Sequence, residues 1–265
     1  MRVFISADIE GCAYTTVWDE TRKDQKDYSA AARQMTAEVA AACEGAIRAG
    51  ADYILVKDAH GTGRNIDPYG LPKCCEIIRA SNGSPRQMVE GIDESFDAVM
   101  FVGYHAAAGR LGNPLSHTYS RKTTDVTLNG RICSEFLIYS YCCAMFGVPS
   151  VFLSGDKMLT EDSRDIHPNL VTVAVKDGFG GFTRCKQPEY ACDLIREGAE
   201  AALRQDLSHA LCKLPEAFVF DVSYKEHTDA ARYSNYPGFI LLDSHTIRME
   251  TKNYEDVLRC IPFVL

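Results

Sequence analysis

The sequence predicts a layered α/β fold, in which a mostly parallel sheet is flanked by helices and a smaller C-terminal α/β unit follows. Strand-like and helix-like segments alternate along the 265 residues, without a repeat, a low-complexity tract or a long linker. The strand-like segments are continuous apolar runs, which is typical of strands covered by helices on both faces. A hydrophobic content of 46% is enough for a large core.

The first 160 residues contain the segments that we expect to form the centre of the sheet. Residues 2–7 form the first strand. A long alanine-rich helix over residues 28–48 follows and ends at Ala49-Gly50, a common helix stop. Three further apolar runs are expected strands, over residues 53–57, 98–104 and 150–153.

Between the last two of these strands the chain carries a turn and a helix start. Asn129-Gly130 lies inside the strand-like residues 127–132 and predicts a short hairpin. Ser134 is a suitable N-cap for a helix over residues 135–146.

The rhythm changes after about residue 210, where strand-like residues 218–222 and 247–251 bracket shorter helical pieces. We therefore expect residues 1–210 to form a catalytic α/β domain that holds the metal site described below. Residues 211–265 would form a smaller C-terminal α/β subdomain.

Charge and hydropathy exclude two classes of partner. A formal charge of −8 and a pI near 5.4 argue against nucleic acid or an anionic membrane as the partner, because both need a basic surface. The apolar run Val3–Ala7 stops at Asp8, and no stretch approaches the roughly 20 residues that span a bilayer. We expect neither a signal peptide nor a membrane segment.

The cysteines indicate a reducing compartment. There are 11 of them, an odd number, and they include the adjacent pairs Cys74-Cys75 and Cys142-Cys143 but no Cys-x-x-Cys. Most are expected to be buried as small apolar side chains. Cys12 and Cys133 differ only in lying beside candidate ligands, and the chain is expected to be cytoplasmic.

Polar side chains follow the expected strands at the points where they end. Asp8-Ile9-Glu10 follows the first strand and Asp58-Ala59-His60 the second, while His105 follows the third and Asp156 the fourth. In an open α/β sheet, ligands bind outside the carboxyl ends of the strands. We therefore expect these side chains to converge.

The converging residue types suit a pair of metal ions. Asp8 and Glu10 lie on one face of an extended chain, and two close carboxylates repel unless a cation or a shared proton relieves them. Adding His60 and His105 makes a mixed oxygen and nitrogen set that suits Zn²⁺. With Glu135 as a further acid, one carboxylate could bridge two ions. Each residue alone is more often solvated or structural, so the joint pattern carries the prediction.

Four motifs also carry a family resemblance. Ser6-Ala7-Asp8-Ile9-Glu10-Gly11, Lys57-Asp58-Ala59-His60, Gly103-Tyr104-His105-Ala106 and Ser116-His117-Thr118 occur in an order and at separations that resemble the DppA-type D-aminopeptidases. The resemblance continues through Asn129-Gly130 with Glu135, Ser154-Gly155-Asp156 and residues 172–176. It covers nearly the first two thirds of the chain and becomes thin in the last third.

The resemblance implies a binuclear zinc peptidase that releases N-terminal D-amino acids from short peptides or amino-acid amides. Asp8, Glu10, His60, His105 and Glu135 would be the ligands of two Zn²⁺ ions per chain, with Asp8 as the bridge. His117 matches the family's catalytic histidine, for which a nucleophilic role is proposed. The resemblance also implies a ring-shaped homo-oligomer.

The residues leave some chemistry open. His117 could carry a proton to the leaving amine or could itself attack the carbonyl. Three departures from the family pattern, Cys12-Ala13, Ser134 and Lys157, remove no ligand but could reshape the pocket.

Two other functions compete with the leading one. The first is a related metal-dependent amidohydrolase that acts on L-peptides or other amides, and the second is a non-catalytic, metal-stabilised binding protein. Substrate chirality separates the first from a D-aminopeptidase. A dispensable His117 would favour the second.

Several other polar residues have plainer interpretations. Asp58 and Asp156 could each orient a ligating histidine. Lys176 is expected to be a solvated strand-end lysine, with a role at the site as the alternative. His167, His209 and His227 are expected at the surface. Asp243-Ser244-His245 superficially repeats the Asp-x-His of residues 58–60 but is expected to have no role at the site.

Overall fold

A seven-stranded sheet forms the centre of the molecule. The computed structural model describes residues 1–164, 166–167 and 169–265. The strand order is β3-β2-β1-β4-β7-β8-β9, and all neighbouring pairs are parallel except β8 and β9. The strands are β1 (Arg2–Ala7), β2 (Tyr53–Asp58), β3 (Cys75–Ile78), β4 (Ala98–Tyr104), β7 (Ser150–Asp156), β8 (Val171–Phe179) and β9 (Phe182–Cys185).

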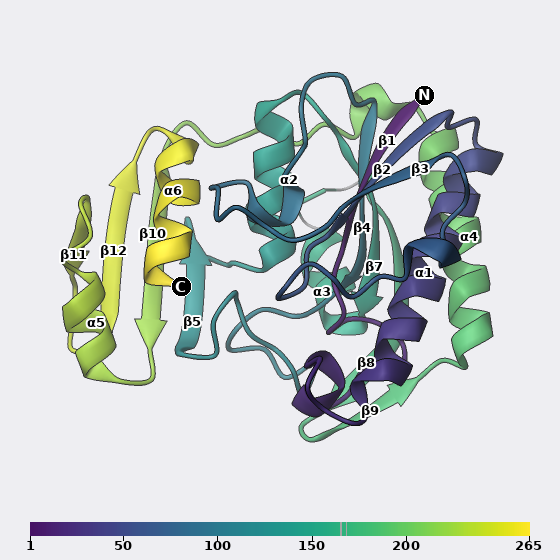
Figure 1. The fold of residues 1–265 in the computed structure, drawn as a ribbon. Coiled ribbons are helices and arrows are strands. Elements are labelled where there is room, and N and C mark those ends of the chain that lie inside the picture. Colours follow the sequence, from purple (N-terminus) through teal and green to yellow (C-terminus); the bar gives the residue numbers. More distant parts are fainter. Residues whose placement is uncertain (165, 168) are drawn as a thin grey trace.

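Two long helices cover one face of this sheet (Figure 1). They are α1 (Tyr28–Arg48) and α4 (Pro188–Arg204), which pack against each other. Alternate side chains of β1 and β4, among them Val3, Ile5 and Met100, point into this layer and are fully buried. The short helix α3 (Lys157–Arg164) packs against β7 and β8.

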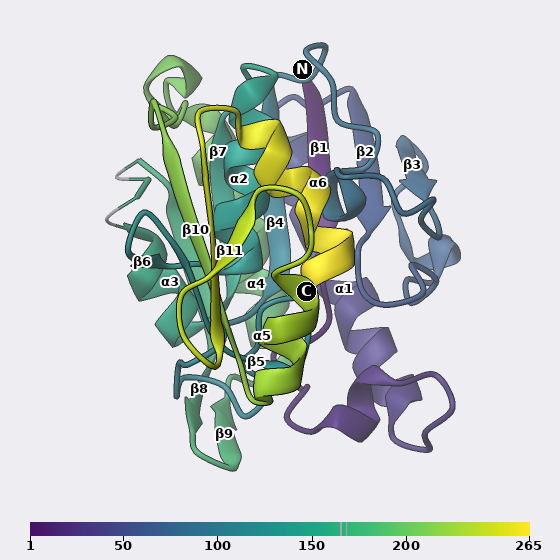
Figure 2. The same cartoon turned by 90° about the vertical axis from the view of Figure 1, so that its left-hand side faces the viewer.

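A second sheet of five strands is antiparallel throughout and has the order β11-β12-β10-β5-β6. It lies at the left of Figure 1, with helix α2 (Glu135–Met145) between it and the parallel sheet. In Figure 2 the helices α5 (His227–Tyr233) and α6 (Tyr254–Val264), which pack on this sheet, lie to the right of its strands. Its strands are β5 (Thr123–Leu128), β6 (Arg131–Ile132), β10 (Phe218–Tyr224), β11 (Phe239–Leu241) and β12 (Thr246–Thr251).

One apolar core joins the two sheets. It combines the second face of the parallel sheet, such as Phe4 and Phe101, with Phe136 of α2 and with Phe220 and Ile247 of the antiparallel sheet. The two sheets are therefore packed through a shared helical layer.

The structure confirms the predicted fold class, a mostly parallel sheet flanked by helices. The expected segments 2–7, 28–48 and 98–104 have the predicted bounds, and the hairpin at Asn129-Gly130 joins β5 to β6. The antiparallel sheet takes β5 and β6 from before residue 210 and the rest from after it. The division into residues 1–210 and 211–265 stays a prediction.

Two expectations about the rest of the chain concern membranes and cysteines. Within the described residues, no helix combines the length and the apolar character that crossing a bilayer requires. The cysteines are free thiols, and six of them, Cys12, Cys43, Cys133, Cys142, Cys143 and Cys260, are buried.

Candidate metal centre

The predicted ligands meet at the carboxyl end of the parallel sheet. Asp8 follows β1, His60 follows β2 and His105 follows β4, so the parallel strands carry all three to the same edge. Glu135 arrives from the other side as the first residue of α2, where Ser134 caps the helix by accepting a hydrogen bond from the Leu137 N–H at 3.1 Å. The structure thus brings together residues that are up to 127 positions apart in the chain.

Two glycines, Gly11 in the loop after β1 and Gly155 in β7, allow the main chain at this edge to approach closely. A Cβ on Gly11 would lie 1.7 Å from the Tyr104 carbonyl oxygen, and a Cβ on Gly155 would lie 1.9 Å from the same atom. Both positions therefore exclude any side chain, and the loop after β1 packs directly on the end of β4.

Asp8 lies between two histidines. Its Oδ1 is 3.3 Å from Nδ1 of His60, and its Oδ2 is 3.4 Å from Nε2 of His105. The side chain of Asp8 is almost fully buried, at 2% exposure. Its two oxygens therefore face two separate nitrogen donors, which is the arrangement of a bridging carboxylate.

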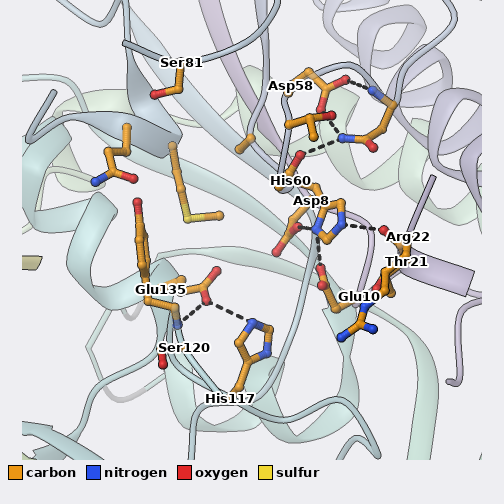
Figure 3. A pocket seen from close by; sticks show the side chains of 18 of the residues that line it. Asp8, Glu10, Thr21, Arg22, Asp58, His60, Ser81, His117, Ser120 and Glu135 are labelled. Carbon is orange, nitrogen blue, oxygen red and sulfur yellow. Dashed lines mark hydrogen bonds and ion pairs between the residues drawn. The ribbon is translucent and has the colours of Figure 1, made fainter. Parts of the chain in front are cut away.

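Glu10 and Glu135 complete one group on each side of Asp8. Glu10 Oε2 is 3.0 Å from Nδ1 of His60, and Glu135 Oε2 is 3.5 Å from Nε2 of His105. Figure 3 shows Asp8, Glu10 and His60 turned toward one another, with Glu135 and His117 as a neighbouring pair. The site has two adjacent positions at which carboxylate and imidazole atoms converge.

Each histidine of this site has one ring nitrogen within hydrogen-bonding distance of a main-chain carbonyl. Nε2 of His60 is 2.8 Å from the Thr21 carbonyl, Nδ1 of His105 is 3.0 Å from that of Ala106, and Nδ1 of His117 is 2.8 Å from that of Leu115. A carbonyl only accepts, so these contacts assign the proton of each neutral ring to that nitrogen. The other nitrogen is left as a lone-pair donor that faces the carboxylates, as metal ligation requires.

His117 lies flat against His105. Their ring centroids are 4.3 Å apart at an angle of 4°, and His117 Nε2 is 3.7 Å from Glu135 Oε1. Ligand atoms of His105, His117 and Glu135 lie within 4.8 Å of one another, and so do those of Asp8, Glu10 and His105. His117 is therefore close enough to the predicted ligands to act on a molecule bound there.

The shifted pKa values in the cluster reflect an excess of buried negative charge. Burial and the neighbouring Glu10 raise the pKa of Asp8 to about 7. Burial alone would lower the pKa of His105, but Glu135 and Asp8 outweigh it and raise this pKa to about 10. His117 differs, because burial and the stacked His105 lower its pKa and favour the neutral ring.

Two buried ligand atoms without hydrogen-bond partners are consistent with a bound cation. Glu10 Oε2 and His105 Nε2 are buried, and neither has a hydrogen-bond partner among the described residues. Buried polar atoms are normally satisfied, so each needs an explanation. A mixed set of carboxylates and imidazoles directed inward suits a divalent ion of the zinc type.

Asp58 and Asp156 orient main chain rather than histidine rings. Asp58 accepts hydrogen bonds from Ile66 N–H and from the amide of Asn65, which itself donates to the His60 carbonyl. Asp156 accepts from the N–H of Ala106, directly after His105, at 2.7 Å. Each aspartate therefore supports a predicted ligand through the backbone.

The structure corrects two expectations about solvent exposure. Lys176 is only 3% exposed and donates from Nζ to the carbonyls of Glu10 and Thr15, so it holds the loop after β1 and is not solvated. His167 is buried against α2, where Nε2 lies 3.1 Å from Ser140 Oγ and the ring meets Phe136 edge-on. Burial comes from a tertiary contact that local polarity does not reveal. His209 and His227 are exposed as expected, and the turn at Asp243 to His245 is exposed as well.

The centre opens into a cavity of about 870 Å³ whose wall contains residues that the sequence patterns did not single out. Trp18, Arg22 and Arg121 belong to this wall. Arg22 and Arg121 lie outside helices and strands, and Trp18 begins a helix of only four residues, so neither helical nor strand periodicity indicates them. Only the presence of a single tryptophan in the sequence could have drawn attention to Trp18 as a wall residue.

The comparisons with known proteins agree with this geometry. A sequence profile described as D-aminopeptidase (peptidase M55) matches residues 1–263. This chain belongs to the D-aminopeptidase family. The chain is therefore a peptide hydrolase by family, and the prediction of a non-catalytic binding protein is set aside.

One curated sequence and one solved structure illustrate the relationship. The D-aminopeptidase of Bacillus subtilis strain 168 is 26% identical over 257 residues, which span 96% of this chain and 92% of that protein. A solved structure of the Zn-dependent D-aminopeptidase DppA from Bacillus subtilis, described as a self-compartmentalizing protease, superposes with a TM-score of 0.92 at 22% identity. The match covers 100% of this chain and 96% of that one. At this identity the superposition establishes the fold.

Proposed function

We propose that this family member releases N-terminal D-amino acids from short peptides or amino-acid amides, using two Zn²⁺ ions. The ligands would be Asp8, Glu10, His60, His105 and Glu135. The observation that carries the proposal is Asp8, whose two oxygens face the lone-pair nitrogens of two different histidines at 3.3 and 3.4 Å. Asp8 would bridge one ion held with Glu10 and His60 and another held with His105 and Glu135.

Bound zinc ions would supply a water of lowered pKa and would polarise the scissile carbonyl. The protein's own groups determine where these partners lie. Thr21 and Ala106 fix the ring protons of His60 and His105 with their carbonyls, and Lys176 anchors the carbonyl of Glu10. The site is thereby organised before substrate binds.

His117 is proposed to carry the proton. Its Nδ1 proton is held by the Leu115 carbonyl, its Nε2 faces the centre, and its lowered pKa favours a neutral ring that can accept a proton and pass it to the leaving amine. Direct attack by Nε2 is the alternative. It would leave an acyl-imidazole, which rapid acid quench and intact-mass measurement would detect and which proton transfer would not form.

The assembly and compartment of the protein are also proposals. DppA, whose fold this chain shares, is described as self-compartmentalizing. We propose a ring-shaped homo-oligomer in the cytoplasm. The free, mostly buried cysteines of the chain support a reducing compartment. Sedimentation of the purified protein would test the assembly.

The first test of the proposed function is metal content paired with substrate chirality. We expect close to two zinc ions per chain and release of D-Ala, in preference to L-Ala, from small amides and dipeptides. A chelator should stop this release, and added zinc should restore it. Metal-independent turnover would refute the ligand assignment, while preference for L-Ala would favour the related L-amidohydrolase.

A further inference from the structure

One wall of the cavity contains a stack of three side chains. The guanidinium carbon of Arg121 lies 4.3 Å from the ring centroid of Trp18, and Trp18 meets His117 edge-on at 5.3 Å and 71°. All three residues line the same cavity as the predicted ligands Asp8, Glu10, His60 and Glu135. The stack therefore connects an exposed cation, Arg121, with the proposed catalytic histidine.

Both sides of this stack are held in place. Trp18 begins the short helix η1 (Trp18–Thr21), whose start is fixed by the Glu20 carboxylate, which accepts a hydrogen bond from Val17 N–H at 2.9 Å. On the other side, the Glu135 carboxylate accepts a hydrogen bond from Tyr119 N–H at 2.6 Å. Arg121 follows two residues later, so the wall is preorganised.

Arg121 has no carboxylate partner among the described residues, unlike its neighbour Lys122. Lys122 bonds Tyr233 and lies 3.9 Å from Asp229, and Lys23 donates to the Arg64 carbonyl. A guanidinium that covers an aromatic face keeps the N–H groups at its edge free. Those groups match the two oxygens of a carboxylate.

The position of Arg121 fits the length of a short peptide. The two separations in the stack limit the distance from its guanidinium to the His117 ring to about 10 Å, and an extended peptide advances roughly 3.3 to 3.6 Å per residue. A dipeptide or tripeptide cleaved beside His117 would therefore end near Arg121. Arg121 lines the same cavity as the predicted ligands Asp8, Glu10 and Glu135.

We propose that Arg121, held on Trp18, binds the C-terminal carboxylate of the substrate and makes this enzyme prefer free-acid peptides of two or three residues to the corresponding amides. The inference deepens the proposed function and rests on it for the position of the scissile bond. Arg121 is thus a specificity-determining residue, and Trp18 is a positioning residue that acts through it.

The test compares D-Ala-D-Ala with D-Ala-D-Ala amide in the zinc-loaded enzyme. The wild type should favour the free acid by at least about tenfold in kcat/KM. Arg121→Gln should remove most of this preference by raising KM for the free acid, since a hydrogen-bonded charge pair contributes on the order of a tenfold to hundredfold effect. Turnover of the amide should stay within about twofold. Arg121→Lys should recover part of the preference, and Trp18→Leu should lose part of it.

Two controls separate this role from its rivals. Arg33→Gln changes an exposed arginine of α1 outside the cavity and should leave the preference unchanged. Arg22→Gln tests the other arginine of the wall. A preference that survives Arg121→Gln, or one that is lost in Arg22→Gln instead, would overturn the proposal.

A binding measurement keeps the proposal testable without turnover. Trp18 is the only tryptophan, so its fluorescence reports on this wall directly. Titration of chelator-treated protein with the dipeptide should change the emission, with affinity at least about tenfold weaker in Arg121→Gln, whereas the dipeptide amide should bind both proteins alike. If the protein binds the free acid through Arg121 but cleaves neither compound, the proposed function fails and the carboxylate site stands. If cleavage occurs and neither readout responds to Arg121→Gln, the carboxylate site fails and the proposed function stands.

Discussion

The two sheets of this molecule differ in how their faces are covered. The central strands β4 and β7 of the parallel sheet are buried along their whole length, because helices or the second sheet cover both faces. Strand β10 of the antiparallel sheet alternates buried and partly exposed residues, as a sheet with one covered face does. The difference shows why the predicted ligands gather on the parallel sheet, since only its strand ends open together into a buried pocket.

The antiparallel sheet nevertheless delivers one predicted ligand. Its strand β6 ends just before Ser134 and Glu135, so the hairpin determines where α2 begins. Glu135 then reaches His105 from the opposite side of the cavity. We conclude that the parallel sheet provides most of the donors, while the second sheet sets the position of the last one.

The largest contrast between the sheets should appear when an aspartate is replaced in each. Asp8→Asn removes the proposed bridging charge, so activity should fall on the order of a thousandfold and bound zinc should fall well below two ions per chain. Asp221→Asn on β10 breaks only a partly exposed pair with Arg248 and should cost at most about 1 kcal/mol, with full activity. Metal analysis and kcat measurements check both. Full zinc content in Asp8→Asn would contradict the bridging role.

Loss of a buried phenylalanine should separate stability from function. Phe220→Ala in the antiparallel sheet and Phe101→Ala in the parallel sheet each remove a fully buried ring, and each should cost about 3 to 5 kcal/mol of unfolding free energy. Only Phe101 meets Tyr104 edge-on at 5.1 Å and Phe136 at 5.0 Å, the neighbours of two predicted ligands. Denaturant unfolding and zinc content should show that Phe101→Ala also weakens zinc binding. Equal zinc loss in both variants would show that the sheets act as one unit.

The layer between the sheets should make stability depend on pH. Burial lowers the pKa of His167 to about 4. Between pH 6.5 and 4 the unfolded chain therefore binds a proton that the folded protein does not, so stability is full above pH 6.5 and falls by up to about 1.4 kcal/mol per pH unit below it. Urea unfolding of His167→Gln across this range should show a shallower dependence. His209→Gln, at an exposed position, should retain the slope of the wild type.

The smallest effect should come from one hydrogen bond in the same layer. Tyr254 of α6 donates from its hydroxyl to the Ile138 carbonyl of α2 at 2.8 Å. Tyr254→Phe should cost about 1 kcal/mol, because the ring stays packed and only this bond is lost. Tyr190→Phe, where the side chain is exposed, should change the melting temperature very little. A much larger loss for Tyr254→Phe would indicate that α6 holds the two sheets together.

The parallel sheet and its strand ends could be predicted because their signals are local. Apolar runs indicate the strands, and Asp8, His60 and His105 each stand one to three residues beyond such a run. The antiparallel sheet could not be assembled in the same way, because β5 pairs with the distant strand β10. Val126 pairs with Val222, which is 96 residues later. No local pattern specifies that pairing.

The cavity wall was hidden from the sequence for a similar reason. The segment that carries His117 and Arg121 turns irregularly, with a positive φ of 64° at Tyr119. It therefore lacks the helical or strand periodicity that a sequence pattern could indicate. The burial of His167 depends on contacts with α2, which tertiary packing alone creates. Residue type and spacing therefore indicate the predicted ligands, whereas the surroundings that would tune them require the fold.

The carbonyl contacts of the three histidines have a consequence for how this scaffold can change. The ring protons are set by the main-chain path at Thr21, Ala106 and Leu115, not by side chains that a point mutation could replace. Substitutions can therefore accumulate around the centre without moving a proton to the wrong nitrogen. A one-residue insertion or deletion near these carbonyls would move them away from the rings and so change which nitrogen carries the proton. We therefore expect variants of this scaffold to tolerate substitutions around the centre better than changes of loop length.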